Sequence, residues 1–249
     1  MSKKKFDLNR HTARLLMDEP FFAALSRRID KAPSTELPTA GMRLNDDGSF
    51  TLLYNPDYFS KLENEEMADV LKHEFYHVIF DHVTGRLPEK NVTKLWNFAT
   101  DLAINSYLKN LPKDCLIPGE GEFEDFPSKL SAEKYHSLLK KRMKEEQKSG
   151  GSGDGKGTPL SDLGEFDDHS GWEPGSEAVS QIAKERLKKM LKDAVKEASS
   201  AGWGSLSQDM KEKILANIEN TLDWRKVLRY FIKTSQKASK ASTVKRINR

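Results

Sequence analysis

The sequence predicts a mainly α fold with a small β-sheet, of the α+β class. Apolar residues recur at helical spacing in several segments, most clearly over residues 61–84, which contain no proline or glycine. Residues 42–54 differ, because Asp47-Gly48 separates two short segments rich in apolar residues, and this predicts a β-hairpin. The chain has 249 residues, of which 32% are charged, so we expect one or two domains and a part outside any core.

Composition divides the chain into four predicted parts. These are a core over residues 1–147, a flexible Gly/Ser-rich loop over 148–175, a helical subdomain packing on the core over 176–236, and a basic tail over 237–249. Residues 181–249 carry 17 Lys and Arg against 7 Asp and Glu. Since the acidic residues are interspersed along helical segments, we interpret the excess as solvated helix faces or a surface for a protein partner, and nucleic acid is not the expected partner.

Composition also bounds the cellular setting. The single cysteine, Cys115, excludes an internal disulfide framework and a Cys-rich zinc finger. The basic residues 1–5 are not followed by an apolar segment, so no signal peptide is expected. No apolar run reaches the ~20 residues that a membrane span requires. We therefore expect a cytoplasmic protein that does not bind a membrane.

The first helical segment comprises residues 7–31. Pro20 lies within it and is predicted either to kink this helix or to begin a second one. Pro33 and Pro38 predict a loop, and the hairpin that follows ends at residues 55–56, Asn-Pro.

The helix predicted over residues 61–84 contains the pattern H-E-x-x-H. Residues four apart share one face of a helix, so His73 and His77 can bind one Zn²⁺ while Glu74 projects beside them. Zinc lowers the pKa of a bound water to about 7, and a neighbouring carboxylate can accept its proton. The alternative is that the pattern is only a polar patch on a helix.

This helix is predicted to begin with a capping box over residues 60–63, with Asn64 as a competing N-cap, and to end before Gly85. His82 is a tempting further ligand. On a continuing helix, however, it would lie about 140° around the axis from His77. We therefore interpret His82 as a structural residue or a cation at the helix end.

A second helix is predicted from Asn91 to Leu108, and it offers a third ligand. Its apolar side comprises Leu95, Trp96, Ala99, Leu102, Ala103 and Ser106. Asp101 and Asn105 lie one turn apart on another stripe, which is either solvated or faces the first helix. Given the upstream pattern, we favour Asp101 as the third zinc ligand and Asn105 as a residue that orients Asp101 or a neighbouring ligand.

Two histidines and one carboxylate leave a fourth position open for water, which is typical of catalytic zinc sites. A different arrangement, the longer motif of metzincins, requires Gly and His where this chain has Phe80 and Val83, so that class is excluded.

Three residues are candidate donors to an oxyanion: Tyr107, His136 and His169. His169 belongs to residues 167–172, DDHSGW, which interrupt the Gly/Ser-rich loop as a candidate lid; the alternative is an exposed turn. Further helices are predicted over residues 131–147, 176–200, 207–220 and 223–235.

Residues 73–82, HEFYHVIFDH, and 96–105, WNFATDLAIN, together resemble the predicted metallopeptidases that precede a von Willebrand factor A-like domain in bacterial and phage proteins. Residues 54–56, 130–135 and 222–228 extend this resemblance over most of the chain. The resemblance implies a zincin-like fold, with Zn²⁺ on His73, His77 and Asp101 and with Glu74 as the general base. Since such proteins continue into the A-like domain, we expect either that domain after the basic tail or a shorter member.

The sequence thus favours a zinc metallopeptidase with a protein or peptide substrate. A strand of the hairpin that precedes the H-E-x-x-H helix could bind such a substrate in extended form at a sheet edge; the alternative is a hairpin without that role. One alternative is a catalytically inactive zinc scaffold of the same fold that binds protein or nucleic acid. Another is a zinc hydrolase that acts on a non-peptide amide.

Overall fold

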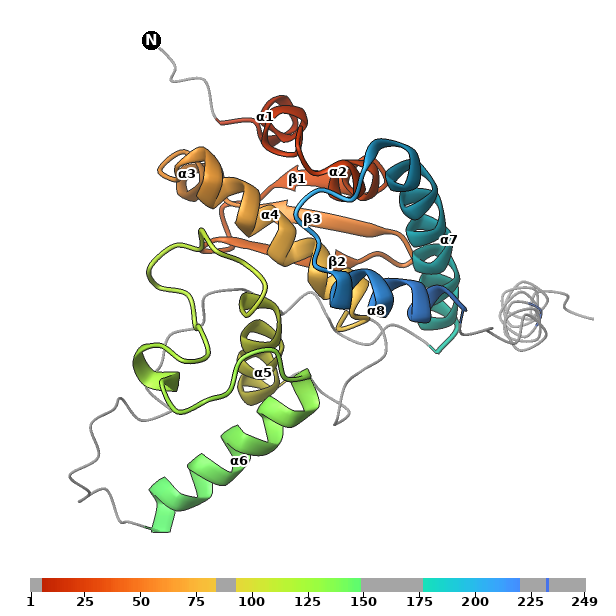
Figure 1. Ribbon diagram of the computed structural model, residues 1–249. Coiled ribbons are helices and arrows are strands. Elements are labelled where there is room, and N and C mark those ends of the chain that lie inside the picture. The colour runs from red at the N-terminus through yellow and green to blue at the C-terminus, as the bar shows by residue number, and fades with distance from the viewer. Residues whose placement is uncertain (1–5, 84–92, 149–176, 220–231, 233–249) are drawn as a thin grey trace, which may run out of the picture.

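The computed structural model describes residues 6–83, 93–148, 177–219 and 232 (Figure 1). These residues form α1 (Leu8–Leu15), α2 (Pro20–Ser26), β1 (Asp30–Pro33), β2 (Ala40–Leu44), β3 (Phe50–Tyr54), α3 (Pro56–Phe59), α4 (Asn64–Ile79), α5 (Lys94–Asn105), the 3-10 turn η1 (Gly121–Phe123), α6 (Ala132–Lys148), α7 (Glu177–Ala201) and α8 (Gln208–Glu219). They are mainly helical with one three-stranded sheet, so the predicted α+β class is confirmed. In this part of the chain, every helix is too short or too polar to span a bilayer.

The two N-terminal helices begin with residues of the types expected at helix starts. The carboxylate of Asp7 caps α1 by accepting a hydrogen bond from the Asn9 backbone N–H at 3.1 Å. Pro20 is the first residue of α2, where its missing N–H costs no hydrogen bond. Of the two predicted roles for Pro20, beginning a second helix is therefore confirmed.

The sheet has the order β1-β3-β2. The predicted hairpin is confirmed, because β2 and β3 pair antiparallel and the turn closes with a 2.8 Å bond from Gly48 N–H to the Asn45 carbonyl. Gly48 has φ 78°, a conformation that glycine adopts without strain. The prediction of helix to residue 31 and then a loop was wrong, since residues 30–33 form β1, parallel to β3. A short edge strand tolerates Pro33 at its end, and its partner is too distant in sequence to leave a local signal.

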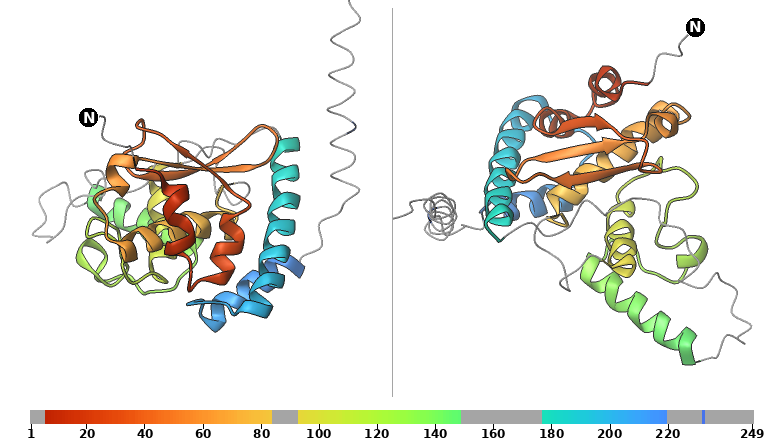
Figure 2. Two further views of the ribbon diagram at one scale, coloured as in Figure 1. Left: turned by 90° about the horizontal axis from the view of Figure 1, so that it is seen from above. Right: turned by 180° about the vertical axis from the view of Figure 1, so that it is seen from behind.

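The helices α1, α2 and α4 lie on one side of the sheet, and α7 stands beside it along α2 (Figure 2). Phe22, Leu52, Val70 and Phe75 are among the fully buried residues of the shared core. α5 packs on α6 and also contacts α4, so the two helices that carry the predicted ligands meet.

The ends of α4 and α5 differ from the predictions. Residues 56–59 form α3, so α4 begins later than the predicted capping box, and its cap is a reciprocal pair of Glu63 and Glu66. α4 also ends earlier, at Ile79. α5 begins three residues after the predicted start, at Lys94, because the Thr93 hydroxyl caps it by accepting from the Trp96 N–H at 3.2 Å.

The C-terminal helices α7 and α8 occupy the predicted segments. The buried stripe of α7 is richer in alanine than expected: it comprises Ala183, Leu187, Leu191, Ala194 and Ala198. The predicted loop over 148–175, apart from Lys148, lies outside the described residues, as does the basic tail over 237–249. The helix predicted over 223–235 also lies outside them, except for residue 232.

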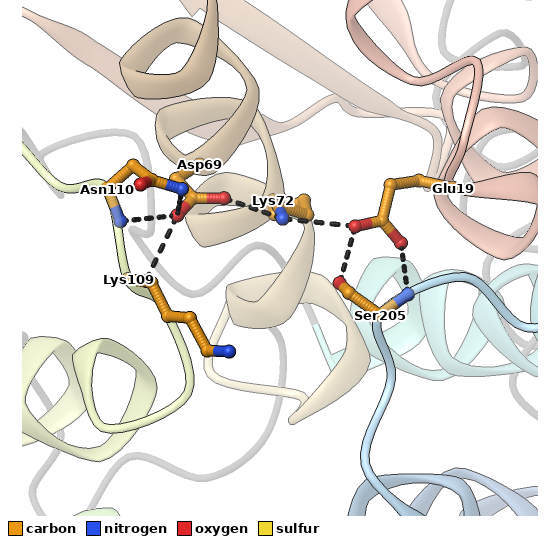
Figure 3. A network of polar contacts seen from close by, with 6 residues as sticks. All are labelled: Glu19, Asp69, Lys72, Lys109, Asn110 and Ser205. Atoms are coloured by element: carbon orange, nitrogen blue, oxygen red, sulfur yellow. Dashed lines mark hydrogen bonds and ion pairs between the residues drawn. The ribbon is translucent and has the colours of Figure 1, made fainter.

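A buried ion network holds α4 from the side (Figure 3). The ammonium of Lys72 lies 2.6 Å from the Asp69 carboxylate and 3.2 Å from that of Glu19, which precedes α2. Glu19 accepts hydrogen bonds from the backbone N–H and the hydroxyl of Ser205, in the connection between α7 and α8. Asp69 accepts from the backbone N–H groups of Lys109 and Asn110, at 3.0 and 2.8 Å, beyond the end of α5. The network therefore joins four distant segments.

Candidate metal centre

Helices α4 and α5 bring three ligand-type side chains together. His73 and His77 lie one turn apart on α4, and their Nε2 atoms are 2.9 Å apart. The Oδ1 atom of Asp101, on α5, lies 3.4 Å from Nε2 of His77 and 3.7 Å from Nε2 of His73. All three residues are buried, and their ligand atoms lie within 4.8 Å of one another. The structure therefore brings together the three residues that the sequence singled out as ligands.

The donor set suits a divalent metal ion. Two imidazoles and a carboxylate are ligands that zinc prefers, and ligand atoms around a tetrahedral zinc lie about 3.3 Å apart. The observed distances of 2.9, 3.4 and 3.7 Å lie around that value. Burial of polar side chains is costly unless they are paired or bind a metal. The cluster therefore can hold a metal ion.

Glu74 lies on α4 directly after His73 and has no exposed surface. It is not one of the three clustered ligands. Its carboxylate thus lies on the helix that carries both histidines, without belonging to the ligand cluster.

Asn105 fixes the ring of His73 from behind. Its Oδ1 atom lies 2.8 Å from Nδ1 of His73, while its amide nitrogen donates to the Leu116 carbonyl at 2.8 Å. The second bond determines which way the amide points, so the oxygen faces the imidazole and accepts its Nδ1 proton. The proton-free Nε2 of His73 then faces His77 and Asp101. Asn105 was predicted to orient either Asp101 or a neighbouring ligand. In the structure its contact is with the neighbouring ligand residue, His73.

We expect Asn105→Leu to weaken metal binding by about 10–100-fold, since the loss of a partner that orients a ligand typically costs that much. Competition with a chromogenic chelator measures this change. Ser106→Ala is the matched control, because the Ser106 hydroxyl contacts the Leu102 carbonyl, the Tyr135 hydroxyl and the Lys129 N–H, which lie outside the ligand cluster. Equal affinities of the two variants would contradict the orienting role.

The other predicted site residues do not join this cluster. The hydroxyl of Tyr107 accepts a hydrogen bond from Lys213 at 2.9 Å and lies 3.4 Å from the Asp209 carboxylate, both on α8. Lys213 also donates a hydrogen bond to the Asp209 carboxylate at 2.9 Å, and this bond lowers the pKa of Asp209. Lys213 and Asp209 therefore form a charged pair. His136 is buried on α6 with its ring 5.5 Å from that of Trp96. His169 lies outside the described residues.

His82 occupies a place that the sequence did not predict. Its ring is buried against that of His77, with centroids 5.4 Å apart and the two Nδ1 atoms 3.3 Å apart. The prediction of a helix that continues past residue 79 was wrong, because Asp81 has φ 58° and the chain turns back there. His82 is buried and does not belong to the ligand cluster, which agrees with its interpretation as a structural residue. Asp adopts this left-handed conformation more readily than most residues, so Asp81 was the one sequence signal for a helix end at this point. His82 also lines a mainly apolar cavity of about 250 Å³, together with residues of α5, of α8 and of the start of α6.

Comparison with known proteins places the chain in a family. A family model described as "Putative metallopeptidase domain" matches residues 3–249. A protein of Thermotoga maritima, described only as "Uncharacterized protein", is 27% identical over 252 residues. The alignment covers 93% of this chain and 60% of that relative, so the chain spans less than two thirds of the relative's length. No solved structure matches the chain. Since the family model covers nearly the whole sequence, the chain belongs to this family of metallopeptidase domains.

Proposed function

We propose that the protein is a zinc metallopeptidase of the zincin type that hydrolyses peptide bonds, with Glu74 as its general base. The observation that carries the proposal is the convergence of His73, His77 and Asp101 within 4.8 Å, next in sequence to a buried glutamate. The family to which the chain belongs supports a peptidase over the other hydrolases that this ligand set could serve.

His73, His77 and Asp101 would hold the zinc ion. When bound, zinc polarises a carbonyl and lowers the pKa of a coordinated water to about 7. Glu74 accepts a proton from the attacking water and later donates it to the leaving amine, so one carboxylate serves both proton transfers. Burial of Glu74 excludes bulk water from competing for this proton. Asn105 keeps the His73 ring in the orientation that ligation requires.

The edge strand β2 supports a peptide substrate. β2 is at one edge of the sheet and packs against α4, the helix that carries the histidines. An extended peptide added along such an edge gains backbone hydrogen bonds that are independent of its side chains. Of the proposed oxyanion donors, His169 is the one we retain, because Tyr107 bonds to α8 and His136 packs on Trp96.

The larger organisation is also a proposal. It comprises the four-part division of the chain, a cytoplasmic location, and an A-like domain or another protein as the partner of the C-terminal region. The sequence resemblance and the distribution of charge support it. The longer Thermotoga maritima relative is a suitable protein in which to look for the additional domain.

Metal analysis of the purified protein tests the proposed site. We expect one zinc per chain in the wild type and less than a tenth of that in His73→Ala and in Asp101→Ala, because two remaining ligands bind zinc weakly. His136→Ala is the matched control, since it removes a buried histidine outside the cluster. Zinc content that is unchanged in His73→Ala would refute the metal site. If the protein contains one zinc per chain but cleaves no unfolded protein, whether a chelator is present or absent from the assay, a catalytically inactive scaffold would be favoured instead.

A further inference from the structure

We propose that the C-terminal cap of α4 is part of the metal site, because it makes His82 the residue that positions His77. This inference rests on the proposed metal centre. It assigns His82 as a positioning residue, which acts on the metal through His77 and not as a ligand.

The backbone after α4 forms a Schellman motif. The Asp81 N–H bonds to the Val78 carbonyl at 3.0 Å, and the His82 N–H bonds to the His77 carbonyl at 2.9 Å. In this motif the chain passes through one residue in the left-handed region, here Asp81 with φ 58°. The residue after it then packs against the side chain five positions earlier. That pair is His82 and His77, so the helix terminus itself brings the two imidazoles together, with their ring planes at 64° to each other.

The chemistry of the contact follows from the ligand role of His77. If Nε2 of His77 binds the metal, the neutral ring carries its proton on Nδ1. This proton faces Nδ1 of His82 across 3.3 Å, so His82 accepts it and carries its own proton on Nε2. Asn105 acts on Nδ1 of His73 in the same way. Each metal-binding imidazole is then fixed from its far side by an acceptor, which sets its tautomer and raises its basicity.

Packing keeps His82 in this position. Its side chain is only 1% exposed, and its ring lies 6.2 Å from that of Trp96 and 5.6 Å from that of Phe80, centroid to centroid. Trp96 itself is fully buried at the start of α5. A ring enclosed in this way has few other rotamers, so its Nδ1 atom stays directed at His77.

Three substitutions of His82 separate positioning from packing. Asparagine places an oxygen where Nδ1 of histidine lies, glutamine places it one atom further out, and leucine offers no acceptor. We expect His82→Leu and His82→Gln to lower zinc affinity about 10–100-fold, and His82→Asn to restore it to within about threefold of the wild type. The readouts are chelator competition and the visible spectrum of the Co²⁺-loaded protein, which reports ligand geometry. A shifted spectrum is expected for leucine and glutamine alone.

Asp81 provides an independent test of the cap. Asp81→Gly and Asp81→Val both remove the carboxylate near Lys184, but glycine accommodates a positive φ without strain and a β-branched valine does not. We expect Asp81→Val to weaken zinc binding and shift the Co²⁺ spectrum as His82→Leu does, and Asp81→Gly to leave both unchanged. Circular dichroism confirms that each variant is folded.

The inference is overturned if His82→Leu keeps wild-type zinc affinity and spectrum, or if His82→Asn is as impaired as His82→Leu. Equal zinc affinities and equal Co²⁺ spectra of the two Asp81 variants would show that the backbone conformation of the cap does not affect the metal site. Failure of the metal centre itself would give a different result, because His73→Ala would then also retain its zinc. In that case His82 would have no metal ligand to position.

Discussion

Replacing Glu74 with glutamine is expected to reduce peptide hydrolysis by about 10²–10⁴-fold while leaving the metal bound, because general base catalysis contributes a factor of that size. Glutamine has nearly the shape of glutamate, so it preserves the packing of a fully buried position. It cannot accept the water proton. The rate of cleavage of an unfolded protein and the zinc content, measured on the same preparation, provide the test.

Glu65→Gln is the matched control for this experiment. Glu65 lies on the exposed first turn of the same helix, so its substitution changes the same charge without touching the site. Activity that survives in Glu74→Gln would exclude Glu74 as the base. Loss of zinc together with activity would instead mean that Glu74 supports the ligands.

The local features of the site could be predicted from the sequence because they depend on helix geometry. His73 and His77 share a helix face whatever the rest of the chain does. The position of Asp101 required one more assumption, that its stripe faces α4, and the structure brings the three residues together. Fold class and the hairpin were predictable for the same reason, since periodicity and the Asp-Gly turn are local.

The features that the sequence did not predict depend on distant contacts or on where an element ends. β1 is a strand because it pairs with β3, and nothing in residues 30–33 encodes that partner. His82 contacts His77 because α4 stops at Ile79, and an error of a few residues in a helix end changes the direction of every later side chain. The hydrogen bond that Lys213 of α8 donates to the Tyr107 hydroxyl likewise depends on a segment distant in sequence.

The buried ion network could not be predicted from the sequence either. Nothing in the sequence distinguishes Glu19, Asp69 and Lys72 from ordinary surface charges. In the structure the side chains of Glu19 and Lys72 are 11% exposed and that of Asp69 is 3% exposed. Only the tertiary fold brings them together. Their burial changes what a substitution costs, because an unpaired buried charge is far more unfavourable than an exposed one.

Lys72→Met is therefore expected to destabilise the protein by about 3–5 kcal/mol, because it leaves two buried carboxylates without their shared cation. Methionine retains most of the volume of lysine, so the cost arises from charge and not from a cavity. Denaturant unfolding measures the change. Lys141→Met is the control: it breaks an exposed ion pair with Glu145 on α6, and we expect no change in the unfolding midpoint.

A double substitution identifies the origin of the loss. Glu19→Gln removes one of the two carboxylates but retains an oxygen that can accept from Ser205. If charge imbalance is the cause, Lys72→Met combined with Glu19→Gln will be more stable than Lys72→Met alone. A purely additive loss would instead attribute the cost to packing. Recovery in the double variant would mean that charge balance holds the residues before α2 and the α7–α8 connection against α4, the helix that carries His73 and His77.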